Sequence, residues 1–185
     1  MEAYEAVTLV MDANGGAING RTAIQKLVYL CATRVGSIDI SSYKHYFYGP
    51  FSRKVASALI DMSAFSYINE TFSLQFGGYK YDFTERGKKL AESVSGRYEN
   101  EREQIGHIVD TCKDFDRDLR PSLLSFAAKS HYILANAEDK KGEYTKDDVR
   151  RVGREFDWDI SREDVDAGVE LLERLNLVKV KRVQT

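Results

Sequence analysis

The sequence predicts an α+β fold that is predominantly helical. Two observations support this prediction: apolar residues recur at helical spacing in several separate stretches, and one stretch alternates polar and apolar residues beside a pair of glycines. The chain has 185 residues, of which 43% are hydrophobic and 30% charged, so it can bury a substantial core. We expect an N-terminal domain over residues 1–95 and a helical region over residues 96–185 packed against it, with the break near Gly96.

Two helices are expected at the start of the chain, over residues 2–13 and 21–35. The first ends at Asn14-Gly15-Gly16, because asparagine and glycine readily take the left-handed conformation that ends a helix. The second has a continuous apolar stripe, formed by Ile24, Leu27, Val28, Cys31 and Val35. This spacing is typical of a helix with one buried face.

An aromatic strand is expected over Tyr43–Tyr48, followed by a helix from Pro50 to about Ala64. Gly49-Pro50 breaks the strand, and proline suits a first helical turn because its missing N–H leaves no bond unmade. Ser52 is the alternative cap of this helix. The inward face of the helix is expected at Phe51, Val55, Ala58, Leu59 and Met62.

A β-hairpin is predicted next, with a two-residue turn at Gly77-Gly78, because glycine tolerates the positive φ of such turns. The expected pairs on one face are Phe76 with Tyr79, Leu74 with Tyr81 and Phe72 with Phe83, and on the other Gln75 with Lys80 and Ser73 with Asp82. A slip of one residue would exchange the two faces. Helices followed by a hairpin indicate a winged helix-turn-helix, with the hairpin as its wing.

The rest of the chain predicts further helices and a short strand. Thr84 caps a helix that begins at Glu85, and residues 97–116 form a charged helix with a thin apolar seam. Pro121 starts another helix, and the capping boxes Thr145-x-x-Asp148 and Ser161-x-x-Asp164 start two more, before a strand over Leu177–Val183. This helix, helix, strand order suggests a second, abbreviated winged-helix-like unit.

Composition and absent motifs exclude several classes of protein. The sequence contains no P-loop, nucleotide-binding glycine fingerprint, nucleophile elbow or HExxH motif, so we expect neither catalysis nor a cofactor. His45, His107 and His131 fall on separate elements without further ligands at metal-binding spacing, so no metal site is expected. Short apolar runs and an acidic N-terminal stretch predict neither a membrane helix nor a secretion signal. Cys31 and Cys112 lie on apolar stripes as free thiols, which indicates the cytoplasm.

Three stretches resemble a known family: Arg21-Thr-Ala-Ile-Gln-Lys-Leu-Val-Tyr-Leu, Tyr46-Phe-Tyr-Gly-Pro-Phe-Ser52 and Tyr81-Asp-Phe-Thr-Glu-Arg-Gly87. Together they are similar to the YwgA-like uncharacterised family of prokaryotic winged-helix proteins. More distantly, the Gln-Lys-Leu-x-Tyr and Gly-Pro elements are similar to the SocA/Panacea antitoxin-associated domain. The resemblance covers about residues 5–95. It implies a scaffold without catalytic residues, and the antitoxin likeness implies protein binding.

Two sets of cations are candidates for contact with double-stranded DNA. The outward face of the helix after Pro50 carries Arg53 and Ser57, which suit contacts in a major groove, and Lys54 and Asp61 lie at its flanks. Lys80 is the cation nearest the wing tip. A second set, Arg150, Arg151 and Arg154, follows one face of the helix after Thr145. Ion pairs with Asp147 and Glu155 on a solvated surface are the alternative for that set. The net charge of −2 and the pI near 6.0 argue against a strongly basic nucleic-acid binder.

Apolar positions on two helices are candidates for contact with a protein partner. Ile60 and Ala64 lie on the same outward face as Arg53 and are poor residues for a DNA groove. The seam of the charged helix contains Ile105, Ile108, Val109, Cys112 and Phe115, and it either packs inside the chain or forms a homodimer. The sequence thus favours a cytoplasmic, prokaryotic DNA-binding or transcription-regulatory protein. The alternative is a protein-interaction module, such as an adaptor or antitoxin-like partner.

Overall fold

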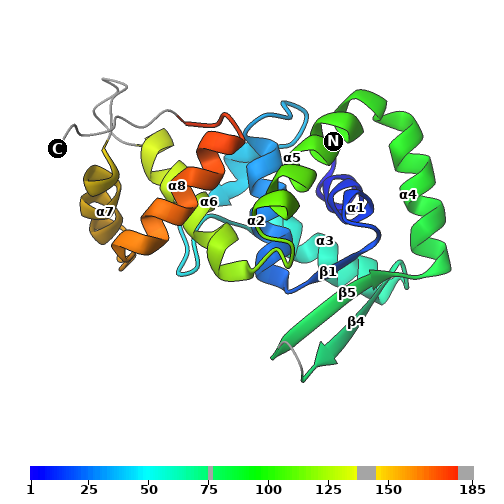
Figure 1. Ribbon diagram of the computed structural model, residues 1–185. Helices are drawn as coiled ribbons and strands as arrows, with labels where there is room; N and C mark the ends of the chain where they lie inside the picture. Colours follow the sequence, from blue (N-terminus) through cyan, green and yellow to red (C-terminus); the bar gives the residue numbers. More distant parts are fainter. Residues whose placement is uncertain (75–76, 137–144, 179–185) are drawn as a thin grey trace.

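The computed structural model describes residues 1–74, 77–136 and 145–178, and in them the protein is α+β and mostly helical (Figure 1). The elements in chain order are α1 (Ala3–Ala13), β1 (Ala17–Asn19), α2 (Arg21–Ala32), the short 3-10 helix η1 (Ile40–Ser42), β2 (Tyr43–Lys44), β3 (Phe51–Ser52), α3 (Arg53–Ala64), β4 (Ile68–Ser73), β5 (Gly78–Phe83), α4 (Glu85–Arg97), α5 (Glu99–Phe115), α6 (Pro121–Asn136), α7 (Lys146–Glu155) and α8 (Arg162–Arg174).

Helix α3 begins at the alternative of the two expected positions. Ser52, rather than Pro50, stands at its N-terminus, and the Ser52 hydroxyl accepts a hydrogen bond from the Val55 N–H. Phe51 and Ser52 are extended because they pair with the strand at Tyr43 and Lys44. The predicted aromatic strand is correspondingly short and ends at Lys44, after which the chain loops back to β3.

The hairpin forms, but with a different register. Phe72 pairs with Tyr79 rather than Phe83, and Ser73 pairs with Gly78, so the turn lies before Gly78 and not at Gly77-Gly78. The expected pairs involving Gln75 and Phe76 lie outside the described residues. The observed register sets Ile68 opposite Phe83 and buries Ile68 completely. Packing of that isoleucine outweighs the turn preference of the glycine pair.

A third strand, β1, was not expected from the sequence. It pairs antiparallel with β5, with Ile18 opposite Tyr81, and gives the sheet the order β1-β5-β4. Tyr81 is fully buried at this junction. Its hydroxyl donates to a Glu70 carboxylate oxygen at 2.6 Å and accepts from Arg21 Nε at 2.7 Å, so an ion-paired cluster joins the sheet to α2.

The two expected parts of the chain share one hydrophobic core. Its fully buried members include Val7 of α1, Leu27 of α2, Ile105 of α5 and Leu124 of α6. Helix α4 continues through Gly96 to Arg97, and α5 packs on α1 and α2. A smaller cluster around Ile133, Val149, Trp158 and Val165 lies where α6, α7 and α8 meet. Figure 1 shows α7 at one end of the molecule and α4 at the other, with the β4–β5 hairpin projecting at the bottom of the view.

The C-terminal strand expected over Leu177–Val183 lies mostly outside the described residues. Of that range, Leu177 and Val178 are described, and they are not in a strand. The helices before it begin where the capping boxes indicated: the Thr145 hydroxyl accepts from Asp148 N–H, and the Ser161 hydroxyl accepts from Asp164 N–H.

Candidate functional site

Helix α3 presents the candidate site because its two faces differ sharply. Val55, Leu59 and Met62 are buried against the core. The opposite face is exposed, and it carries Arg53, Ser57, Ile60 and Ala64 as the sequence predicted, with the exposed Lys54 and Asp61 at its flanks.

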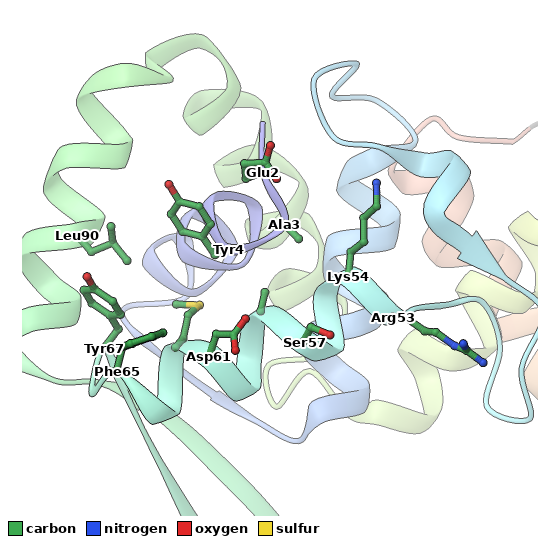
Figure 2. A pocket seen from close by; sticks show the side chains of 12 residues that line it. Glu2, Ala3, Tyr4, Arg53, Lys54, Ser57, Asp61, Phe65, Tyr67 and Leu90 are labelled. Atoms are coloured by element: carbon green, nitrogen blue, oxygen red, sulfur yellow. The ribbon is translucent and has the colours of Figure 1, made fainter.

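A cavity of 650 Å³, which we call the α3 groove, lies between this helix, the first turn of α1 and α4. It is lined by Glu2, Ala3, Tyr4, Arg53, Lys54, Ser57, Ala58, Asp61, Met62, Phe65, Tyr67 and Leu90. Figure 2 shows these side chains in order along the groove: an apolar end with Phe65, Tyr67 and Leu90, then Asp61 and Ser57, and finally the two cations. The groove is therefore apolar at one end and polar at the other.

The charges around the α3 groove nearly balance. Lys54 Nζ lies 2.8 Å from a carboxylate oxygen of Asp39. The hydrogen bond from Lys54 lowers the pKa of Asp39 to about 2, and the same bond raises the pKa of Lys54. Glu2 and Asp61 add negative charge to the lining. Arg53 is exposed and has no ion-pair partner among the residues that the structure describes.

The remaining predicted DNA contacts do not join this site. Lys80 lies on the hairpin, with its Nζ 3.6 Å from a carboxylate oxygen of Asp82. The three predicted arginines lie on α7, far from the hairpin in Figure 1. Arg150 pairs with Asp147 at 3.8 Å, and Arg151 pairs with Asp148 at 3.4 Å and with Glu155 at 3.7 Å. Arg154 is exposed. The cations are scattered and mostly paired, so they form no continuous basic surface.

The seam of α5 proves to be interior, which corrects its assignment as a partner-binding surface. Ile105, Ile108 and Cys112 are at most 5% exposed, because the seam packs onto α1 and α2 within the chain. Burial raises the pKa of the Cys112 thiol to about 12 and that of Cys31 well above its usual range. Of the predicted partner contacts, only Ile60, 63% exposed, and Ala64 lie on the surface.

The three histidines occupy separate places. His45 Nε2 donates to the Phe156 carbonyl at 2.7 Å, and His131 Nδ1 lies 2.9 Å from the Tyr29 hydroxyl. Burial lowers the pKa of His131 to about 4. In the described ranges, no three His, Cys, Asp or Glu side chains are grouped to hold a metal ion.

Two buried lysines were missed by the sequence analysis. Lys26 is 2% exposed and donates from Nζ to the Pro50 carbonyl at 2.8 Å, while Lys129 is 8% exposed beside the Trp158 ring. Burial, with a contribution from Lys129, lowers the pKa of Lys26 to about 7. A Cβ added at Gly49 would lie 3.0 Å from Lys129 Cγ and 3.5 Å from Lys26 Cε, and the φ of +94° at this position already favours glycine. Lys26 lies outside the apolar stripe that contains Ile24 and Leu27, so the sequence pattern did not indicate that its side chain is buried.

No protein-family model matches the chain, and a search of curated proteins finds none that matches it. Among the helices in the described parts of the chain, none has the length and apolar character needed to cross a membrane.

Proposed function

We propose that this protein is a non-catalytic protein-interaction module whose α3 groove receives an amphipathic helix of a partner protein. The observation that carries the proposal is the apolar end of the groove, where Phe65, Tyr67 and Leu90 gather beside Tyr4. Exposed apolar clusters rimmed by polar residues are typical of protein–protein contact sites. If the protein bound DNA instead, this face of α3 would have to enter a groove of the duplex, and its apolar and acidic side chains disfavour such contacts.

The length and charge of the groove define the partner segment. From Arg53 to Phe65, α3 rises by about 18 Å, which matches about three turns of a partner helix. Apolar side chains of the partner would pack at the Phe65 end. Asp61, midway, favours a hydrogen-bond donor or cation, and Arg53 favours an acidic group at the far end.

A winged-helix scaffold is part of the proposal. Apart from the short elements η1, β2 and β3 between α2 and α3, the chain order is α1-β1-α2-α3-β4-β5. This order and the sheet order β1-β5-β4 support the scaffold, since a hairpin follows the third helix and the strand between the first two helices completes the sheet. The resemblance of residues 5–95 to YwgA-like and SocA/Panacea proteins is in keeping with this scaffold and with protein binding.

Site-specific crosslinking in the source organism tests the groove. A photoreactive p-benzoylphenylalanine replaces Ser57 in the groove or, as a matched control, the exposed Ser93 on α4. We expect one discrete protein adduct at Ser57 and none at Ser93. The captured protein is then purified and titrated calorimetrically, and Phe65→Asp should weaken its binding at least tenfold. Equal adducts at both positions, or unchanged affinity of the Phe65→Asp variant, would contradict the proposal.

Double-stranded DNA is the second candidate ligand, favoured by the exposure of Arg53 and Ser57 at the N-terminal end of α3. If that function holds, a labelled duplex binds at low salt, and Arg53→Glu abolishes the binding. The interaction-module proposal instead predicts no duplex binding that depends on Arg53. Fluorescence anisotropy across a salt series separates the two.

A further inference from the structure

The loop between β2 and β3 exposes three consecutive aromatic side chains. Tyr46, Phe47 and Tyr48 are 48%, 75% and 68% exposed. Aromatic side chains carry a large apolar surface, and leaving three of them in water forgoes the stabilisation of burying them. The rings of Tyr46 and Phe47 lie 5.5 Å apart, and exposed apolar surface of this kind is typical of interaction sites.

The backbone of this loop is held in place from behind. Trp158 Nε1 donates to the Tyr46 carbonyl at 2.9 Å, and so does the Gly49 N–H at 2.9 Å. His45 is bonded to the Phe156 carbonyl, and the buried Lys26 holds the Pro50 carbonyl. The aromatic side chains are therefore exposed on a fixed frame, which lowers the entropy lost when they bind a ligand.

A second cavity, of 460 Å³, lies between this loop and the N-terminus of α3. We call it the loop pocket. Its described lining is Ser42, Lys44, His45, Tyr46, Phe51, Arg53 and Lys54, so its charged members are all cations. The rings of Tyr46 and Phe51 lie 5.0 Å apart at its wall. Lys54 is paired with Asp39, whereas Lys44 and Arg53 have no ion-pair partner within the described ranges.

The loop pocket brings Lys44 and Arg53 beside the Tyr46 ring, and the exposed rings of Phe47 and Tyr48 follow on the same loop. Cations beside an exposed ring point to a ligand that offers both anions and flat faces. Single-stranded nucleic acid supplies both, because its phosphates repeat along the chain and its unpaired bases stack on aromatic side chains. The bases of a duplex are paired and stacked inside the double helix, so they cannot stack on the exposed rings of the loop. An acidic peptide supplies negative charge but no comparable series of flat faces.

We propose that the loop pocket and the aromatic loop bind single-stranded nucleic acid. Bases stack on Tyr46, Phe47 and Tyr48, and phosphates contact Lys44 and Arg53. This function is additional to partner binding in the α3 groove. The two sites share Arg53 and Lys54, but the apolar end of the groove takes no part in it.

Fluorescence anisotropy on the full chain, with labelled oligothymidine or oligouridine of about 12 nucleotides, tests the proposal. We expect binding that weakens between about 50 and 200 mM salt. The double variant Phe47→Ala/Tyr48→Ala should weaken binding at least about tenfold, because each stacked base contributes about 1–3 kcal/mol. Lys44→Gln and Arg53→Gln should each reduce the slope of log affinity against log salt by about 0.7.

Matched variants elsewhere control for general effects. Phe72→Ala removes an aromatic ring that is 54% exposed on the hairpin, and Lys89→Gln removes an exposed cation on α4. Neither should change oligonucleotide affinity, and Phe65→Asp, which tests the α3 groove, should not change it either. Unchanged far-ultraviolet circular dichroism and an unchanged midpoint of urea unfolding establish that the loop variants fold.

Several results would overturn the proposal. Absence of oligonucleotide binding at low salt would do so, as would equal losses in the loop and control variants. If a duplex of the same length binds as tightly as the single-stranded oligonucleotide, the site is one for double-stranded DNA and the proposal is wrong. An oligoglutamate peptide that displaces the oligonucleotide at equal concentration would reassign the loop pocket to acidic peptides.

Discussion

Lys26→Met is expected to change the stability of the protein in opposite directions at low and high pH. The ordinary pKa of a lysine, 10.5, falls to about 7 for Lys26 in the folded state, first because of burial and second because of Lys129. Between these values the unfolded chain holds a proton that the folded protein has lost. The free energy of unfolding therefore rises as the pH increases from about 7 to 10.5, and this gain in stability is lost again as the pH falls back toward 7.

The size of the effect follows from the two pKa values. The fall in the pKa of Lys26 from 10.5 to about 7 means that burying its protonated form destabilises the folded protein by about 5 kcal/mol at most, since each pKa unit is worth about 1.4 kcal/mol. Methionine removes this penalty but leaves the Pro50 carbonyl without its donor, which costs about 1–3 kcal/mol. We expect the variant to be about 2–4 kcal/mol more stable at about pH 6 and about 1 kcal/mol less stable at about pH 10.

Urea unfolding followed by circular dichroism at about pH 6, 8 and 10 measures this difference. Lys89→Met, at an exposed position on α4, controls for the general effect of replacing a lysine by methionine. A stability difference between Lys26→Met and the wild type that is the same at all three pH values would refute the reasoning, because the buried ammonium would then contribute nothing.

Two further pairs of variants test the packing. Gly87→Ala should destabilise the protein by about 3 kcal/mol or more, because its Cβ would stand 2.0 Å from the Tyr67 carbonyl oxygen. Gly96→Ala, on the same helix, should instead stabilise the protein by about 0.5–1 kcal/mol, because a Cβ added there would meet no atom within 4 Å. Equal effects of the two substitutions in urea unfolding would disprove the close approach at Gly87. Ile105→Ala should cost about 2–5 kcal/mol, since the side chain is fully buried, whereas Ile60→Ala should stay within about 0.5 kcal/mol. A small effect at Ile105, with a change in oligomeric state by light scattering, would restore the α5 seam as a dimer interface.

Three of the helix starts were predictable because their signals are local. Thr84, Thr145 and Ser161 cap helices as expected, since each bond joins residues three positions apart. The hairpin register was not predictable in this way. A shift of four residues keeps every side chain on its expected face, so alternation fits both registers, and burial of Ile68 decides between them.

The candidate sites depended on contacts distant in sequence. The outward face of α3 was predicted, but the α3 groove needs Tyr4 and Leu90 from other helices. The aromatic segment Tyr43–Tyr48 was visible, yet it was expected to be a strand. The loop that exposes Tyr46, Phe47 and Tyr48 is held from more than a hundred positions away, by Trp158 at the Tyr46 carbonyl and by the Phe156 carbonyl at the His45 side chain.

That anchoring has a consequence for synthesis on the ribosome. His45 and Tyr46 acquire their partners 111 and 112 residues later in the chain. At about 5–20 residues per second, about 5–20 s pass between the emergence of the loop and that of its anchors. During this interval the nascent chain displays three aromatic rings on a loop that lacks its C-terminal anchors, and a chaperone that recognises exposed aromatic segments would meet them before the C-terminal helices are made.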